Sequence, residues 1–234
     1  MKIKIFYKFF FCTVFLFRIC GIYAQKTLAV MNDSIENKAK PLNGIQTMRA
    51  VFSNMPDSII PVLTKNNRLD CIDFFDSHMK AVVKNRFSQE SEMETLTKDY
   101  LSFKTSTSGS FEMKLLPVND STQIFCLVKH FYGPACDSEI SFYNFSWQKL
   151  PSSHYISLPD MNDFLVSDST RTSDMSAIDM KLYQINLDSL SSDLKISFSS
   201  LNYLSKENAV LLTPSFGKNF ILYQWMKGRF IRKE

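Results

Sequence analysis

The chain has 234 residues, of which 45% are hydrophobic and 14% aromatic, with only 6 glycines and 8 prolines. This composition excludes a disordered or low-complexity protein, because there is enough apolar surface to offset the entropy lost on folding. The formal net charge is +4, but residues 1–24 hold four basic residues and no acid, so the rest of the chain is neutral overall. The charge therefore gives no argument for binding nucleic acid or an anionic membrane.

Residues 1–24 have the pattern of a cleavable secretory signal. Three lysines precede an apolar run at residues 9–17, and the small side chain of Ala24 suits a cleavage site. The run is about half of the ~20 apolar residues that a membrane-spanning helix requires, and Arg18 follows it directly. We therefore expect export to the periplasm or the cell surface, with no stable membrane span after cleavage.

Residues 25–54 are predicted to be a polar leader, and residues 55–154 the first of two folded halves. Asp57 and Ser58 offer capping oxygens for a short helix. A second helix is predicted over residues 69–87, where apolar side chains recur at steps of three and four.

From residue 100 the apolar period changes to two. Phe111, Met113 and Leu115 alternate with Glu112 and Lys114, which is typical of a strand with one buried face. Further strands are predicted at residues 124–131 and 140–147, giving an antiparallel meander of about four strands.

Residues 155–234 are predicted to form the second half. A short helix is expected at residues 158–165, and strands at residues 180–187, 194–199, 209–213 and 220–231. The predicted fold class is therefore α+β, with two tandem halves, each a helical segment packed on a roughly four-stranded antiparallel sheet.

Three cysteines follow the signal: Cys71, Cys126 and Cys136. An odd number does not form a disulfide framework. If a hairpin turns at Gly133 and Pro134, Cys126 lies opposite about residue 141, so Cys136 is four to five residues away along the ladder. A bridge between them would need a bulge or a different turn, and we expect buried thiols instead.

No sequence motif of catalysis is present: there is no G-x-S-x-G, H-E-x-x-H, phosphate-binding glycine loop or C-x-x-C. His78, His130 and His154 fall on separate predicted elements. The acidic row, whose members are Asp70, Asp73 and Asp76, is interpreted as the solvated face of a helix, because a helical row lacks the wrap-around oxygens of a calcium loop. We expect no catalytic residue, no metal site and no cofactor.

The most unusual loop follows the strand at residues 124–131. Tyr132, Gly133, Pro134 and Asp137 combine an aromatic side chain with a rigid turn and a carboxylate. Such a loop can present a fixed surface to a partner, although Gly-Pro also simply reverses a chain. These four residues are our candidate binding site.

Residues 55–64, 67–74 and 133–138 resemble an uncharacterised family of exported proteins from Bacteroidetes-type bacteria, known only as a domain of unknown function. The resemblance implies a periplasmic or cell-surface location and no particular activity. The two predicted halves also resemble β-lactamase-inhibitor-like tandem domains, a likeness at fold level that supplies no function.

These observations favour an exported, non-catalytic envelope protein that binds another protein or an envelope component through the exposed face of its sheet or through its Gly-Pro loop. The alternative is a periplasmic hydrolase with a dispersed carboxylate site. A eukaryotic secreted protein is a third alternative, allowed by Asn-x-Ser triplets at Asn32, Asn119 and Asn144.

Overall fold

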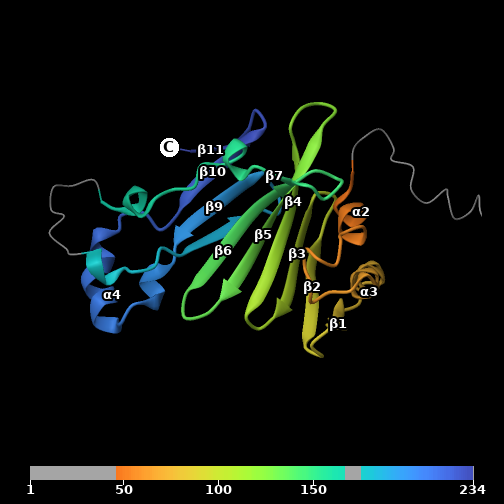
Figure 1. The fold of residues 1–234 in the computed structure, drawn as a ribbon, viewed down its shortest axis with the longest axis horizontal. Coiled ribbons are helices and arrows are strands. Elements are labelled where there is room, and N and C mark those ends of the chain that lie inside the picture. The colour runs from red at the N-terminus through yellow and green to blue at the C-terminus, as the bar shows by residue number, and fades with distance from the viewer. Residues whose placement is uncertain (1–45, 167–174, 234) are drawn as a thin grey trace, which may run out of the picture. The chain divides into compact units, whose positions relative to one another are not determined.

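The computed structural model describes residues 46–166 and 175–233, which form an α+β arrangement with two antiparallel sheets (Figure 1). The predicted signal and residues 25–45 of the predicted leader lie outside the described residues. The helical elements are α2 (Met48–Ser53), α3 (Lys65–Asp76), α4 (Lys206–Leu212) and the 3-10 turns η1 (Ser152–His154), η2 (Met161–Phe164), η3 (Met175–Ala177), η4 (Ser200–Tyr203) and η5 (Thr213–Ser215).

The large sheet is a seven-stranded meander in which every strand pairs with its neighbours in sequence. It has seven strands rather than the roughly four predicted, because much of the segment predicted as helix or left unassigned is extended. Its strands are β1 (Val82–Lys84), β2 (Glu90–Leu96), β3 (Tyr100–Ser106), β4 (Gly109–Pro117), β5 (Gln123–Tyr132), β6 (Cys136–Tyr143) and β7 (Lys149–Leu150).

Helices α2 and α3 pack on one face of the large sheet. Phe111, Met113 and Leu115 of β4 belong to this core, as the alternating pattern predicted. Phe52 of α2 packs against Phe103 and Phe111, with ring centroids 5.7 and 6.3 Å apart. The predicted leader is therefore wrong at its C-terminal end, since α2 lies within it and buries an aromatic side chain in the core.

The two predicted helix boundaries in this region are also wrong. No helix begins at Asp57; residues 56–63 form turns, and α3 begins after Thr64, whose hydroxyl and the Asn67 side chain form a reciprocal capping box. The helix ends at Asp76 instead of continuing to residue 87, and His78 follows with a positive φ of 55°. The chain then enters β1, where β-branched valines favour extended backbone.

The small sheet has the strand order β11-β10-β9-β8 and packs on the other face of the large sheet through a second core. Both faces of β5 are consequently buried over most of its length. Phe142 of β6 and Phe230 of β11 meet in this shared core, with ring centroids 6.2 Å apart. The strands are β8 (Tyr183–Leu187), β9 (Asp193–Phe198), β10 (Ile221–Met226) and β11 (Arg229–Arg232).

Two predictions for the second half are wrong. The segment predicted as a strand at residues 209–213 lies largely in α4, whose N-cap is Ser205, because a short apolar run suits either element and the serine cap decides for helix. The run at residues 220–231 is not one strand but a β10–β11 hairpin, which reverses at Lys227 and Gly228 with φ values of 52° and 76°. The short helix expected at residues 158–165 is the 3-10 turn η2.

Candidate functional site

The tip of the β5–β6 hairpin contains three of the four residues of the predicted binding loop. The strands turn between Tyr132 and Cys136, which are paired in register. Tyr132 is 42% exposed, its backbone N–H donates to the Ser108 carbonyl at 2.9 Å, and its hydroxyl lies 2.8 Å from the Ser110 hydroxyl. The neighbouring Phe131 is 53% exposed. The structure therefore presents two aromatic side chains beside the Gly-Pro turn.

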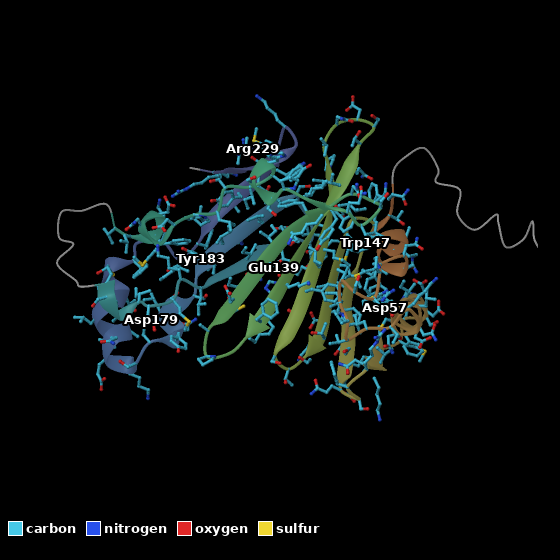
Figure 2. All side chains as sticks on the ribbon, in the orientation of Figure 1. Asp57, Glu139, Trp147, Asp179, Tyr183 and Arg229 are labelled. Carbon is cyan, nitrogen blue, oxygen red and sulfur yellow. The ribbon has the colours of Figure 1, made fainter. Side chains whose placement is uncertain are left out.

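The fourth loop residue, Asp137, lies against the small sheet. Its Oδ1 accepts a hydrogen bond from the backbone N of Tyr183 at 3.3 Å, and Figure 2 shows Tyr183 on the small sheet. The preceding carbonyl, that of Cys136, accepts from the Ser199 hydroxyl at 2.5 Å. The structure thus brings Tyr132, Gly133 and Pro134 together at the tip and uses Asp137 to join the two sheets.

Asp137 is one of three side chains that cap the outer edge of β8. The backbone N of Ile185 donates to Ser138 Oγ at 3.1 Å, and the backbone N of Leu187 donates to Glu112 Oε2 at 2.8 Å. We call Asp137, Ser138 and Glu112 the β8 caps. They supply the acceptors that a further strand would otherwise provide, so this edge of the small sheet is satisfied by side chains of the large sheet.

His130 lies between two of the caps and is only 2% exposed. Its Nδ1 is 3.0 Å from Ser138 Oγ, and its Nε2 is 3.6 Å from Glu112 Oε2. The other oxygen of Glu112 accepts a hydrogen bond from the Tyr100 hydroxyl at 3.0 Å. Burial, and then the nearby Glu112 carboxylate, raise the pKa of Tyr100, which keeps this phenol protonated as a donor.

Ser138, His130 and Glu112 stand in the order of a nucleophile, base and acid. Ser138 also borders a hollow of about 550 Å³ beside β6. However, its hydroxyl oxygen already accepts from Ile185 N, and the imidazole is buried between the sheets. The arrangement therefore joins the sheets, with the Ser138 hydroxyl bonded both to the small sheet and to His130.

Lys114 is buried beside this cluster and is 1% exposed. Its Nζ lies 3.0 Å from Asp99 Oδ2, 3.3 Å from the Ser189 carbonyl and 5.6 Å from the centroid of the Tyr100 ring. Glu112 and Lys114 are the polar residues of the alternating strand pattern, which we expected to face solvent. That expectation is wrong, because the small sheet covers the face on which they lie.

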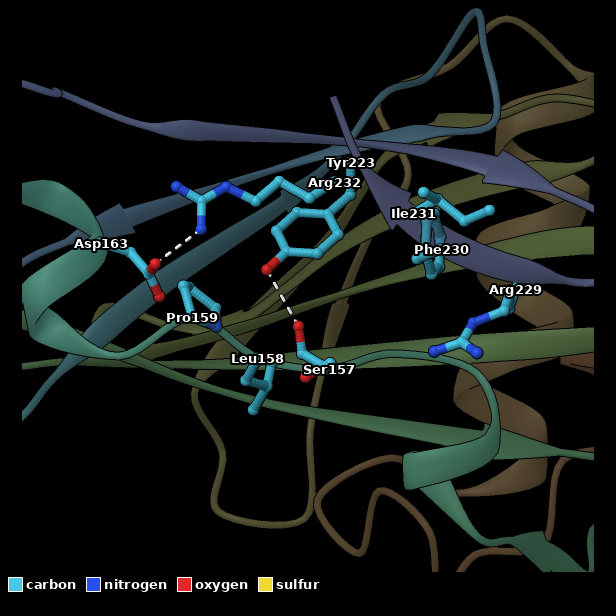
Figure 3. Close-up of a pocket in the computed structure, with 9 residues that line it drawn as sticks. All are labelled: Ser157, Leu158, Pro159, Asp163, Tyr223, Arg229, Phe230, Ile231 and Arg232. Atoms are coloured by element: carbon cyan, nitrogen blue, oxygen red, sulfur yellow. Dashed lines mark hydrogen bonds and ion pairs between the residues drawn. The ribbon is translucent and has the colours of Figure 1, made fainter. Parts of the chain in front are cut away.

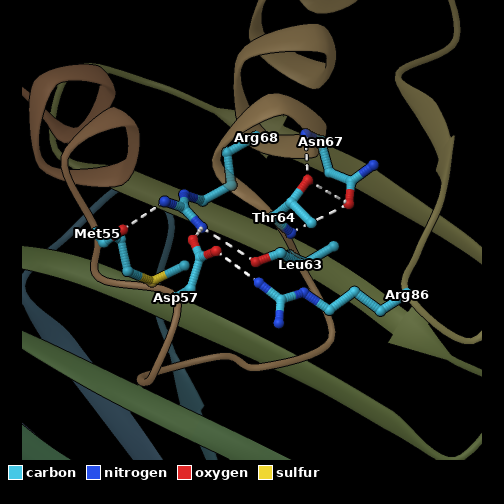
Figure 4. Close-up of polar contacts among 7 residues, drawn as sticks. All are labelled: Met55, Asp57, Leu63, Thr64, Asn67, Arg68 and Arg86. Carbon is cyan, nitrogen blue, oxygen red and sulfur yellow. Dashed lines mark hydrogen bonds and ion pairs between the residues drawn. The ribbon is translucent and has the colours of Figure 1, made fainter.

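A second buried polar cluster anchors the turns before α3 (Figure 4). Arg68 is 1% exposed; its guanidinium donates to Asp57 Oδ1 at 2.9 Å and to the carbonyls of Leu63 and Met55. Asp57 also accepts from Arg86 at 2.6 Å. The hydrogen bond from Arg68, followed by the charges of both arginines, holds the pKa of Asp57 below its ordinary value. This cluster holds the loop in place, and the charge of the buried Arg68 is paired with that of Asp57.

The three cysteines are free thiols, and Cys126 lies opposite Phe142, one residue from the predicted position. Cys71 and Cys126 are fully buried, as expected, whereas Cys136 is half-buried. Burial raises the pKa of both Cys71 and Cys126 to about 12, which makes them poor nucleophiles.

The remaining residues considered for chemistry lie apart from these clusters. In the acidic row on α3, Asp76 forms an ion pair with Arg49 at 2.5 Å, while Asp70 and Asp73 are exposed. His78 and His154 are also exposed. Within the described ranges, no three or more His, Cys, Asp or Glu side chains group as metal ligands, and no helix is both long and apolar enough to cross a bilayer.

A hollow of about 390 Å³ lies at the edge of β11 (Figure 3). Residues 157–159 form one wall and β11 forms the other. Figure 3 shows Arg229 and Arg232 at opposite ends of the hollow, with Arg232 paired to Asp163 at 2.7 Å. The Tyr223 hydroxyl donates to the Ser157 carbonyl at 2.9 Å, and both residues line the hollow.

Sequence reasoning did not identify this hollow or the β8 caps. The partners of each cap lie 46 to 75 residues away, and no local pattern signals such a pairing. The one available signal for the hollow was the density of basic residues near the C-terminal end of the sequence, which the neutral overall charge concealed.

Comparison with known proteins places the chain in a family without an assigned activity. The family model described as "Protein of unknown function (DUF3256)" matches residues 43–230. The chain belongs to this family. A solved domain of an uncharacterized protein from Porphyromonas gingivalis W83 is similar at 24% identity and a TM-score of 0.71, over 80% of this chain and 98% of that one. At this identity the likeness shows the fold alone.

No curated protein matches the chain. The predicted resemblance to an uncharacterised Bacteroidetes family is confirmed by the family match and by the Porphyromonas structure. The family supplies no activity, so function has to be argued from this chain's own surface.

Proposed function

We propose that this protein is an exported, non-catalytic protein of the periplasm or cell surface that binds another envelope protein through the tip of the β5–β6 hairpin. The observation that carries the proposal is the exposure of two aromatic residues that are consecutive in the sequence, Phe131 at 53% and Tyr132 at 42%. Aromatic residues dominate the binding free energy of protein interfaces because they bury a large area with few rotatable bonds.

The tip is held rigid before any partner arrives. The Tyr132 ring stacks on His130 at a centroid distance of 6.1 Å, and its hydroxyl and backbone N–H are bonded to β4 and to the β3–β4 turn. Pro134 fixes its own φ, which restricts the turn further. A preorganised surface loses little conformational entropy on binding, which leaves more of the contact energy for affinity.

The β8 caps on β6 also help to hold the tip of the β5–β6 hairpin in position. Ser138 and His130 are hydrogen-bonded to each other and lie directly beneath the hairpin tip, and Asp137 ties β6 to β8. In this proposal, Tyr132, Gly133 and Pro134 contact the partner with Phe131, and Asp137 keeps the hairpin in position.

We also propose that residues 55–154 and 155–234 are two tandem halves of the chain. This proposal is supported by the presence of helix and antiparallel sheet on both sides of residue 155, and it is weakened by the position of α4 between β9 and β10.

The experiment is photo-crosslinking in producing cells, with a benzophenone amino acid at position 131 and a C-terminal tag. We expect one envelope protein to be captured reproducibly. For the comparison of variants the probe is placed at Thr107, and the double variant F131A/Y132S is expected to capture at least tenfold less of this protein than the otherwise native chain with the same probe. Phe220→Ala is the matched control, because Phe220 is a similarly exposed aromatic residue, 48% exposed, directly before β10. Equal capture by the F131A/Y132S variant and by the control would contradict the proposal.

A periplasmic hydrolase is the second candidate, and the line formed by Ser138, His130 and Glu112 beside a hollow favours it. The hydrogen bond from Ile185 N to Ser138 Oγ argues against a free nucleophile. A fluorophosphonate probe distinguishes the two candidates. We expect no labelling of the native protein, whereas labelling that is abolished by Ser138→Ala would favour the hydrolase.

A further inference from the structure

The two edges of the small sheet are treated differently. The edge at β8 is closed by the β8 caps, whereas the edge at β11 is open for part of its length. Lys233 N donates to the Leu222 carbonyl of β10, so the neighbouring Arg232 directs its backbone groups away from the sheet. Phe230 N, which also points outward, donates to the Tyr155 carbonyl at 2.7 Å.

The open backbone positions border the hollow of Figure 3. Within the described ranges, no hydrogen-bond partner is found for the backbone N–H and C=O of Arg232 or for the C=O of Phe230. Residues 157–159 face these groups across the hollow without pairing as a strand. An unpaired strand edge of this kind is a template for an added strand.

The side chains around this edge are predominantly cationic. The two hollows that border this edge are lined by four basic side chains and one acidic side chain, that of Asp163; the basic ones are Lys218, Arg229, Arg232 and Lys233. Lys218 and Lys233 border a second hollow, of about 680 Å³, which shares Arg232 with the first. Arg229 and Lys233 are exposed, and neither has an ion-pair partner among the described residues.

One carboxylate, that of Asp163, borders the first hollow. It is paired with Arg232, and the hydrogen bond from this arginine holds the pKa of Asp163 below its ordinary value. Asp163 therefore neutralises the Arg232 end, while the Arg229 end and the Lys233 side keep their positive charge. Incoming carboxylates are attracted to Arg229 and Lys233.

We propose that the β11 edge binds an extended acidic segment of a protein partner, which adds to the small sheet as a further strand. The partner's backbone pairs with the open groups of Phe230 and Arg232, and its carboxylates meet Arg229 and Lys233. The alternation of side chains along an added strand gives such a segment a preference for acidic residues at every second position. This site is independent of the hairpin tip proposed above.

The test measures fluorescence anisotropy of a labelled peptide with alternating glutamate and valine, Glu-Val-Glu-Val-Glu-Val, added to the protein lacking residues 1–24. We expect binding at low salt that weakens as ionic strength rises, and at least tenfold weaker binding of the corresponding Lys-Val peptide. The double variant R229E/K233E is expected to lose at least tenfold in affinity. The matched control, K84E/K104E, changes two exposed lysines on β1 and β3 and is expected to stay within twofold of the wild type.

Strand addition is tested with the same peptide carrying N-methyl groups on alternate backbone nitrogens, which keeps its charge and removes its donors. We expect at least a tenfold loss of affinity. Equal binding of the methylated peptide, or equal binding to wild type and R229E/K233E, would overturn the proposal. The same holds if the acidic peptide does not bind at all, or if inorganic phosphate or anionic lipid vesicles compete with it at equal charge concentration.

Discussion

The Glu112 carboxylate and the backbone nitrogen of Leu187 lie 2.8 Å apart and join the two sheets across 75 residues of sequence. The same carboxylate accepts from the Tyr100 hydroxyl and contacts His130, so one side chain satisfies several buried groups. Its side chain is 15% exposed, which leaves little access for water to replace these partners. The stability of the interface between the sheets should therefore depend on this residue.

The first prediction is that Glu112→Ala lowers the free energy of unfolding by about 3 kcal/mol, because two buried donors lose their acceptor at about 1–3 kcal/mol each. Glu112→Gln keeps one acceptor oxygen, so it is expected to lower the free energy of unfolding by less than Glu112→Ala does. The measurement is urea unfolding followed by tryptophan fluorescence. Glu94→Ala, at an exposed position on β2, is the control and should change stability by less than about 0.5 kcal/mol. Equal stability of the two alanine variants would contradict the prediction.

The second prediction concerns Arg68, which is buried and reaches two backbone carbonyls and Asp57 with one guanidinium. Arg68→Lys is expected to lower the free energy of unfolding by about 3 kcal/mol. The lysine ammonium cannot reproduce the planar set of donors of a guanidinium, so buried acceptors are left unpaired. The matched control is Arg86→Lys, which changes a half-exposed arginine bonded to the same carboxylate. If both lysine variants unfold at the same urea concentration, the buried guanidinium does not stabilise the loop.

The third prediction is acid destabilisation. The pKa values of Asp57, Asp76 and Asp163 are lowered, in each case first by a hydrogen bond from an arginine. A carboxyl with a lower pKa in the folded state binds fewer protons when folded, so its contribution is fully present above its ordinary pKa of 3.8 and is lost as the pH falls through the folded value. The contribution of these three carboxylates to stability should be level above about pH 5 and should fall below about pH 4. Asp57→Asn should make that decline shallower, and an unchanged slope would contradict the assignment.

The fourth prediction concerns the thiols. Because burial raises the pKa of Cys71 and Cys126 to about 12, neither should react with Ellman's reagent at pH 8 in the folded protein lacking residues 1–24. Half-buried Cys136, whose pKa is also raised by burial, should react slowly and ahead of the other two. All three should react at once in denaturant, and a smaller number there would indicate a disulfide.

The fifth prediction tests the β10–β11 turn. Gly228 has a φ of +76°, a conformation that costs a residue with a Cβ about 1 kcal/mol, so Gly228→Ala should lower the melting temperature. Gly133→Ala is the control, because a Cβ there would meet only the Ala135 carbonyl, at an ordinary contact distance of 3.7 Å. If the two variants melt together, the left-handed turn is not under the constraint that the structure indicates.

Much of the large sheet could be predicted because its strands carry local signals. The alternation at Phe111, Met113 and Leu115 identified the face that packs on the helices, and the Gly-Pro pair located the β5–β6 turn to within one residue of register. What periodicity cannot show is whether a second layer covers the opposite face. Lys114 was therefore expected in solvent, although a strand more than 60 residues later in the chain buries it.

The errors elsewhere have a common physical origin. The apolar run in α4 is too short for periodicity to separate helix from strand, so one capping serine decides. The candidate sites depend on distant pairings, since each β8 cap meets its backbone partner only after the sheets have packed together. The exposed aromatic pair was partly foreseen through Tyr132, because turn residues are identifiable locally, whereas Phe131 was assigned to the strand.

The β8 caps also imply an order of folding. In the large sheet, strands pair with their neighbours in sequence, whereas each β8 cap bonds a backbone nitrogen at least 46 residues further along the chain. Contacts between residues that are close in sequence form faster. The large sheet should therefore fold first, and one of its apolar faces stays exposed to solvent until the small sheet packs on it. A polypeptide interrupted before Tyr183 would keep Ile124, Val128 and Ile140 open to other copies, and aggregation of such fragments follows from the same geometry that stabilises the complete chain.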